Sequence, residues 1–474
     1  MKRILKYGSL TLIALCLVVI GTLYWMGTRD DASSGGRAST AKENAQQIPS
    51  LTEQTRQTQI LGAEEPAEAQ ALIAQGRYLA RLGNCMGCHT VPGGQAYAGG
   101  TPIPTPFGTF YGPNITSDPK AGIGDWSADD FWRALHNGKS KNGSLLYPAF
   151  PYTEYTRVSR ADSDALFAYL RTVAPSNQPS RAHVLDFPYD QRAMLAFWRA
   201  LYFEPGVMPA DDAQSAQWNR GRYLVEGLGH CAACHAPRNS LGATRWSAGL
   251  AGGMIAGLDW YAPSLTGYPA TGLGKWTAQD IATLLRTGMA RHSTASGPMA
   301  EVVLGSSQYL TEDDALAMGV YLKSLSAFPR ENLTPDSRAE QDSQMGDRES
   351  IQGEAVVPPS RATMERGGKL YAQYCAQCHQ DQGQGNGLAW PALAGNPTVT
   401  APSAVNAIRL VLHGAFAPAT NANPRPHGMP PFGQILGDND IAALVSYIRF
   451  SWDNRAGAVT GFDVKRVRDA SALD

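Results

Sequence analysis

Cysteine is scarce in this sequence, and its distribution limits what the thiols can do. Of 474 residues only 7 are cysteines, and six of these fall in three short motifs. This leaves no cysteine pairs for a disulfide framework. The seventh, Cys16, lies in an apolar run directly after the bulky Leu15, and we expect a lipid-facing thiol there rather than a lipidated one.

The chain also lacks a strong charge and the motifs of several large enzyme classes. Its formal net charge is -1 and its isoelectric point is near 6.8, so it has no basic footprint for nucleic acid. We find no Rossmann fingerprint, no P-loop and no propeller repeat in the sequence. A nucleotide cofactor is therefore not expected.

Three copies of the pentapeptide Cys-x-x-Cys-His are present. They are Cys85, Cys88 and His89; Cys231, Cys234 and His235; and Cys375, Cys378 and His379. This pattern is the attachment signature of c-type haem. Two thiols three residues apart can add to the two vinyl groups of one porphyrin, and the adjacent imidazole can then ligate the iron. The sequence predicts three covalently bound haem c groups.

Structural zinc is the other common use of paired cysteines. Zinc pairs are usually completed by a second pair or by two histidines about 12–20 residues away. Here the motifs are 146 and 144 residues apart, and each of them ends in histidine. The spacing favours haem.

The N-terminus combines a basic flank with a long apolar run. Lys2, Arg3 and Lys6 precede an uncharged stretch from Tyr7 to Met26, whose length is close to one bilayer span. The positive-inside rule then predicts that everything after Thr28 is outside the cytoplasm. A cleaved signal peptide is the alternative, but the run exceeds a usual signal h-region, and no clear cleavage site follows it.

Near-equal motif spacing predicts three related domains. Polar stretches poor in apolar periodicity, at residues 30–68 and 330–359, have the composition of solvated connections. The expected organisation is an anchor or signal at 1–28, a tether at 29–70, cytochrome domains at 71–205 and 206–330, a linker at 331–360, a third cytochrome domain at 361–455, and a tail at 456–474.

The three units share an order of elements, which predicts an all-α fold. A helix with a glycine precedes each motif, and glycine allows a second helix to approach closely; these glycines are Gly76, Gly221 and Gly368. Capping boxes at Ser127 with Asp130 and at Thr277 with Asp280 predict helix starts. Amphipathic segments at 164–172, 313–325 and 439–450 close the units, and we expect Tyr169, Tyr321 and Tyr447 to contact the first helix of each.

A haem that carries electrons needs a second axial ligand, and methionine sulfur is the one that raises the potential. Met429 precedes Pro430 and Pro431, and Met299 follows Pro298. Both lie before the closing helix of their unit, and we predict that both ligate iron.

The first unit lacks this methionine. Phe150 stands at the equivalent position, and no methionine occurs between Met86 and Met194. His136 aligns with Arg286 and His413, in units that have their methionines, so this position is better suited to donating hydrogen bonds to a haem propionate. His183 stays open as a ligand. We expect haem 1 to be open, water-bound or held by an unusual residue.

The sequence resembles the three-haem cytochrome c subunits of membrane-bound periplasmic dehydrogenases that act on alcohols, aldehydes, gluconate or fructose. The resemblance is carried by the three haem motifs and by residues 108–116, 122–126, 146–149 and 429–432. It implies three tandem class I-like cytochrome c domains after an N-terminal membrane anchor on the periplasmic face of a bacterial inner membrane. Several relatives have methionine where this chain has Phe150.

The resemblance implies an electron-transfer role, with no catalytic residue in this chain. A separate catalytic subunit, of molybdopterin, pyrroloquinoline quinone or flavin type, would oxidise the substrate, a further small subunit could be present, and this chain would reduce ubiquinone. The residues around Phe150 look more like cytochromes paired with molybdenum-containing aldehyde or N-heterocycle dehydrogenases. The alternative is a haem enzyme in which an open haem 1, with Glu154 and His183, reacts with peroxide or another small ligand.

Overall fold

The computed structural model describes residues 16–29, 67–255, 257–269, 271–326, 357–387 and 389–471. Most of the expected tether and most of the expected linker lie outside these residues. The chain forms two compact units, one made of residues 1–209 and 226–230, the other of residues 210–225 and 231–474. Three repeats are thus distributed over two units.

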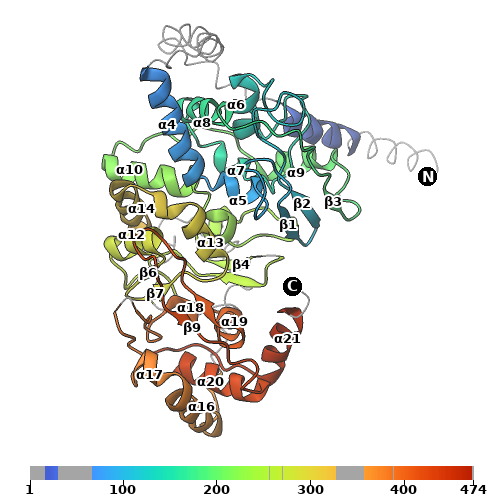
Figure 1. Cartoon of the computed structure of the whole chain (residues 1–474). Helices are drawn as coiled ribbons and strands as arrows, with labels where there is room; N and C mark the ends of the chain where they lie inside the picture. The colour runs from blue at the N-terminus through green and yellow to red at the C-terminus, as the bar shows by residue number, and fades with distance from the viewer. Residues whose placement is uncertain are drawn as a thin grey trace, which may run out of the picture. The chain divides into compact units, whose positions relative to one another are not determined.

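The first unit is mainly helical (Figure 1). A helix over residues 16–28 comes first. The helices that follow are α4 (Ala67–Leu82), α5 (Cys85–His89), α6 (Ala128–Asn137), α7 (Tyr152–Tyr155), α8 (Arg160–Arg171) and α9 (Met194–Tyr202). The strands β1 (Pro102–Thr105), β2 (Gly108–Tyr111) and β3 (Val184–Leu185) form an antiparallel sheet in that order.

The second unit holds two repeats. Its helices, with η2 at the change between units, are α10 (Ala216–Tyr223), η2 (Leu224–Leu228), α11 (Ala232–His235), η3 (Trp246–Ala248), α12 (Ala278–Thr287), α13 (Pro298–Gly305), η4 (Ser307–Tyr309), α14 (Glu312–Ser324), α16 (Arg361–Tyr374), α17 (Ala376–His379), α18 (Pro397–Thr400), α19 (Val405–His413), α20 (Asp438–Phe450) and α21 (Gly461–Ser471). Its antiparallel pairs are β4 (Gly253–Ile255) with β5 (Trp260–Ala262), β6 (Met289–Ala290) with β7 (Ser293–Thr294), and β8 (Ala415–Phe416) with β9 (Gly428–Met429).

The structure is mostly helical, as expected from the sequence, but each repeat also contains short paired strands in its long loops. These strands are two to four residues long, too short to show an alternating apolar pattern. The predicted helix starts are confirmed: Ser127 with Asp130 and Thr277 with Asp280 both form reciprocal capping boxes.

The same helix crossing occurs in all three repeats: α4 with α8, α10 with α14, and α16 with α20. At each crossing a glycine lies against a backbone carbonyl, and a Cβ atom there would overlap the oxygen of Ala165, Ala317 or Ala443. The glycines are Gly76, Gly221 and Gly367. In the third repeat the contact residue is Gly367, one residue before the Gly368 expected from the alignment. Tyr169, Tyr321 and Tyr447 lie beside these glycines, as predicted.

The C-terminal residues form a helix where we expected a tail. Val464 and Val467 on α21 are buried in the core of the third repeat, with Ile441 and Leu444 of α20. Arg468 donates to Asp438 at the start of α20 at 2.8 Å. This segment is therefore part of the folded domain.

Among the described residues, no helix is both long enough and apolar enough to cross a membrane. The apolar run from Tyr7 to Met26 is only partly covered by the structure, because residues 7–15 lie outside the described part.

One buried side chain joins the two repeats of the second unit. Asn406 on α19 accepts from the Tyr261 N–H at 2.9 Å and donates to the Tyr261 carbonyl at 2.7 Å. These residues are 145 positions apart, and Asn406 is 4% exposed. Arg409, one turn further along α19, lies over the Trp260 ring. The amide thus satisfies both backbone groups of Tyr261 inside the unit.

We expect Asn406→Ala to destabilise the second unit by about 2–4 kcal/mol, because it leaves a buried donor and a buried acceptor without a partner. Thermal or denaturant unfolding of the haem-loaded protein measures this loss. The exposed Asn421 provides the control, since Asn421→Ala should change stability by less than about 0.5 kcal/mol. Equal stability of the two variants would contradict the role given to Asn406.

Candidate haem sites

Each Cys-x-x-Cys-His motif forms one short helical turn. In this conformation residues three and four apart lie on the same side, so both thiols and the imidazole face one region. The His235 N–H donates to the Cys231 carbonyl, and the His379 N–H to the Cys375 carbonyl, each at 2.9 Å. The local sequence therefore presents the three groups that a c-type haem requires.

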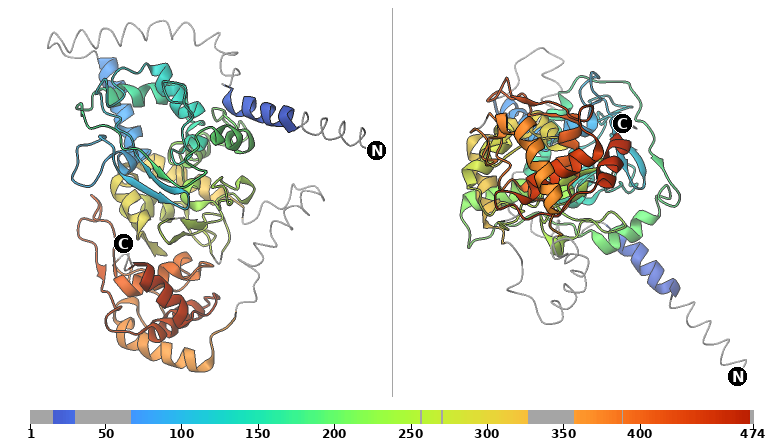
Figure 2. Two further views of the ribbon diagram at one scale, coloured as in Figure 1. Left: turned by 90° about the vertical axis from the view of Figure 1, so that its right-hand side faces the viewer. Right: turned by 90° about the horizontal axis from the view of Figure 1, so that it is seen from below.

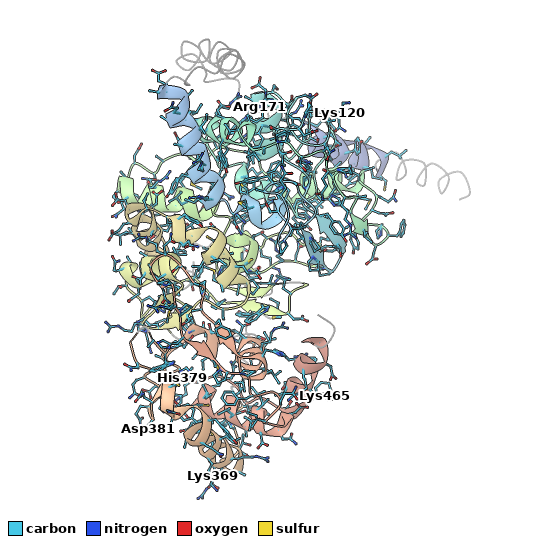
Figure 3. All side chains as sticks on the ribbon, viewed as in Figure 1. Lys120, Arg171, Lys369, His379, Asp381 and Lys465 are labelled. Atoms are coloured by element: carbon cyan, nitrogen blue, oxygen red, sulfur yellow. The ribbon has the colours of Figure 1, made fainter. Side chains whose placement is uncertain are left out.

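The histidine of every motif makes the same bond to a distant proline. Its Nδ1 lies 2.7 Å from the Pro113 carbonyl oxygen for His89, 2.7 Å from that of Pro263 for His235, and 2.9 Å from that of Pro391 for His379. A carbonyl only accepts, so Nδ1 carries the proton and Nε2 keeps its lone pair for iron. Figure 3 labels His379, which ends α17.

The electrostatic environment keeps these rings neutral. Burial lowers the pKa of His89, His235 and His379, and the bond to the proline carbonyl opposes this shift in each case. A neutral imidazole is the form that binds a metal ion. Burial is the larger cause, and it therefore favours the ligating form.

The first thiol of each motif is enclosed by its surroundings. Burial raises the pKa of Cys85, Cys231 and Cys375 to about 12, and the second cysteine of each motif adds to this shift. A neutral sulfur is what such a site accommodates, because a charged thiolate would lose its hydration. A thioether, which carries no charge, fits all three positions.

A glycine with positive φ holds each histidine backbone, and these glycines were not expected from the sequence. The N–H groups of Gly99, Gly252 and Gly385 donate to the carbonyls of His89, His235 and His379 at 2.8, 2.8 and 3.0 Å. Their φ angles are 82°, 84° and 67°. A Cβ atom at each would collide with the backbone of the proline loop, so the glycine brings motif and loop together. Glycines 6–17 residues after the motif histidine were the available signal.

We expect Gly385→Ala to weaken the third site. Two costs apply: about 1–2 kcal/mol for a left-handed alanine and about 1–3 kcal/mol for the collision with the backbone around Trp390. Gly387 has φ of 57° with open space around it, so Gly387→Ala should show only the first cost. Thermal loss of haem 3 absorbance compares the two variants. Identical midpoints would contradict the role of Gly385 in bringing the motif and the proline loop together.

The expected sixth ligands of the second and third repeats lie on ordered elements. Met429 is in β9 and packs against the third repeat's core, and Met299 is the second residue of α13, directly after Pro298. The nearby Met289 is engaged elsewhere, because its sulfur accepts from Asn423 Nδ2 at 2.8 Å. Ligation by Met299 and Met429 stays a prediction.

In the first repeat an aromatic pair occupies the methionine position. The Phe150 and Tyr155 rings are 5.4 Å apart at 61°, and the Tyr155 hydroxyl donates to the Gly83 carbonyl. Burial raises the pKa of Tyr155 well above its usual value, with Cys85 and Cys88 next among the causes. This pair therefore lies beside the first motif.

The two other histidines of the first repeat have separate partners. His183 Nδ1 accepts from the Tyr111 N–H at 3.2 Å, which puts the ring proton on Nε2 and leaves it unsuited to bind iron. His136 is buried against Trp132, with ring centroids 4.5 Å apart, and its Nδ1 donates to the Thr156 carbonyl at 2.9 Å. Its donor is thus used inside the protein rather than kept for a propionate.

Arg286, which holds the position of His136 in the second repeat, does fit a propionate. Arg286 Nε is buried without a hydrogen-bond partner among the described residues, and a carboxylate is the group that an arginine donor prefers.

Glu154 and His183, considered for peroxide chemistry, belong to different clusters. The Glu154 carboxylate accepts from Thr153 on α7, whereas His183 packs against Phe110 and Tyr147.

Comparison with known proteins supports the haem assignment. The cytochrome c family profile matches residues 73–174 and 364–452. The chain is 39% identical, over 86% of its length and 87% of the relative, to the cytochrome c subunit of alcohol dehydrogenase (quinone) of Gluconacetobacter polyoxogenes. It is 40% identical, over 84% and 90%, to the gluconate 2-dehydrogenase cytochrome c subunit of Pantoea cypripedii.

A third relative is a subunit of nicotinate dehydrogenase of Pseudomonas putida. The identity is 40% over 80% of this chain, which spans 30% of that longer protein. The middle repeat lies outside the segments matched by the family profile. It nonetheless has the same histidine-to-proline bond, the same positive-φ glycine and the same helix crossing as the other two.

Proposed function

Because the chain belongs to the family of cytochrome c subunits of alcohol and gluconate dehydrogenases, we propose that it carries three haem c groups and reduces ubiquinone. Electrons come from a catalytic dehydrogenase subunit, and this chain does not itself oxidise the substrate. The observation that carries the proposal is the threefold bond from histidine Nδ1 to a proline carbonyl.

The bound haem supplies a one-electron iron couple, and the chain determines its attachment and potential. Cys85, Cys231 and Cys375, with their partners Cys88, Cys234 and Cys378, form the thioether bonds. The prolines would keep the Nε2 atoms of His89, His235 and His379 unprotonated and able to bind the iron. Met299 and Met429 complete two sites as iron ligands that raise the potential.

The first site differs in potential from the other two. Phe150 brings no ligating atom, and the Nδ1 bond of His183 leaves a protonated Nε2. Haem 1 is therefore open, water-bound or held by another residue. An open haem 1 could also react with small ligands, and rapid peroxide turnover by the isolated subunit would favour that second function.

The catalytic partner is a dehydrogenase for aldehydes or alcohols, with a slight preference for the molybdenum-containing aldehyde type. The preference rests on the Tyr-Pro-Ala-Phe-Pro-Tyr segment at residues 147–152.

The chain is anchored at its N-terminus on the periplasmic face of the inner membrane. The basic residues before Tyr7 and the apolar run to Met26 support this orientation. The described helix over residues 16–28 carries the second half of that run.

The test uses the complex purified from membranes with its catalytic subunit. A pyridine haemochrome assay should give three haems per chain, and two after replacement of Cys375 and Cys378 by alanine. Substrate-dependent ubiquinone reduction should fall at least tenfold in that variant and stay unchanged in Cys16→Ser. Undiminished quinone reduction, or fewer than three haems in the unchanged chain, would overturn the proposal.

A further inference from the structure

The segment between α8 and α10 contains a helix that is apolar on both sides. Helix α9 has one charged residue, Arg199, which is buried and donates to the Gly27 carbonyl at 2.9 Å and to the Asn137 carbonyl at 2.6 Å. Leu195 and Ala196 face the interior. Met194 and Leu201, seven residues apart on the other side, are 51% and 59% exposed. An apolar outer face of this kind is typical of a helix that contacts lipid or another protein.

The C-terminal end of the helix over residues 16–28 is fixed to α9. We call the contacts that hold it the clamp. Gly27 is buried, and a Cβ atom there would overlap the Ala196 carbonyl oxygen. Lys139 Nζ donates to the Thr28 carbonyl at 2.6 Å, so Lys139 and Arg199 together place two cations at the helix C-terminus, where the helix dipole favours them. The Tyr24 and Phe197 rings are 6.0 Å apart. Figures 1 and 2 show the N-terminal helix beside α9 from different directions.

Exposed apolar side chains are frequent in the N-terminal helix and in the segment that contains α9. Among the described residues, 25 large apolar side chains are exposed, and thirteen of them lie in the N-terminal helix or between Val184 and Val207. They are Leu17, Val18, Val19, Ile20, Tyr24, Trp25, Met26, Val184, Phe187, Tyr189, Met194, Leu201 and Val207. We call the last six of these, which lie outside the N-terminal helix, the α9 surface.

The position of the C-terminal end of the N-terminal helix identifies what covers the α9 surface. The apolar run ends at Met26, and the clamp begins at Gly27 and Thr28, so about 3 Å of helix rise separates them. If the apolar run from Tyr7 to Met26 spans the bilayer, the outer boundary of that bilayer therefore lies beside α9. Tyr24 and Trp25 lie at that level, and these residue types favour the membrane interface.

We propose that the α9 surface rests on the outer leaflet of the phospholipid bilayer. This inference rests on the proposed N-terminal anchor and adds a second, peripheral contact to it. The clamp makes the two contacts rigidly connected, so the first repeat is held in a fixed orientation at the membrane rather than on a free tether.

The test measures whether water reaches single cysteines in the full, haem-loaded chain. Met194→Cys, Leu201→Cys and Phe462→Cys are each made in a Cys16→Ser background and placed in phospholipid nanodiscs at one chain per disc. Phe462 is 75% exposed on the charged helix α21 and serves as the control. A polyethylene glycol maleimide should modify the two α9 cysteines at least tenfold more slowly than the cysteine at position 462, and all three equally fast in a denaturing detergent.

The outcomes separate this inference from the anchor. If the chain resists alkaline carbonate extraction but the α9 cysteines react as fast as the control, the anchor stands and the surface contact is wrong. If protection appears only when several chains share a disc, the occupant is a second copy, and the lipid contact is also overturned. A chain that carbonate releases from the membrane overturns both.

Discussion

Replacing Met429 with leucine is expected to lower the reduction potential of one haem by on the order of 100 mV or more, since axial ligands set haem potentials over a range of about 0.8 V. Leucine keeps the volume of the side chain and removes the sulfur, so the loss is electronic rather than structural. Met429 and Gly428 in β9 are held by the backbone pairing to Ala415 and Phe416 of β8, and the loop should persist. Spectroelectrochemical titration of the purified complex measures all three potentials.

Two further variants make this experiment specific. Met289→Leu removes a buried sulfur that accepts from Asn423. Because this sulfur is not a predicted axial ligand, every reduction potential should stay within about 20 mV of its value in the unchanged protein. Phe150→Met places a thioether where the first repeat has none, and haem 1 should shift upward. Three unshifted potentials in Met429→Leu would show that another group ligates haem 3.

Gly76→Val is expected to destabilise the first unit by about 3 kcal/mol or more, because its side chain would enter the Ala165 carbonyl at the crossing of α4 and α8. Both partners at this contact are backbone, so no rotamer change can relieve the overlap. The helices would have to separate, and the first haem motif directly follows α4. Loss of haem 1 should accompany the loss of stability.

The control for this prediction is Ala74→Val on the same helix. Ala74 is exposed, so valine there costs only its lower helix propensity, less than about 1 kcal/mol. Denaturant unfolding followed at the Soret band compares the variants, and haem content per chain reports the fate of the first site. Wild-type stability in Gly76→Val would mean that the helices do not cross at this glycine.

Much of the local architecture was predictable because its causes lie within a few residues. The haem pentapeptides are contiguous, and the capping boxes of α6 and α12 join residues three apart. The glycines Gly76 and Gly221 followed from the repeat. The third crossing differed by one residue, because alignment on the motif does not say which of two adjacent glycines meets the backbone of α20.

Other parts could not be predicted because they depend on distant pairs. The strands are too short to leave a sequence pattern, and the burial of Val464 and Val467 depends on the surface that α20 presents to α21. His183 and His136 could not be assigned from sequence, since each role depends on which backbone group reaches Nδ1.

The sequence by itself determined that this chain attaches haem, how many motifs it has, and where their thiols and imidazoles lie, because these groups are neighbours in one helical turn. Only the tertiary structure decided which nitrogen of each histidine carries the proton and which keeps its lone pair. That choice is made by proline carbonyls 24, 28 and 12 residues away, brought near by positive-φ glycines. The place where the N-terminal helix packs was likewise decided by folding, because the hydrogen-bonded residues Arg199 and Gly27 are 172 positions apart.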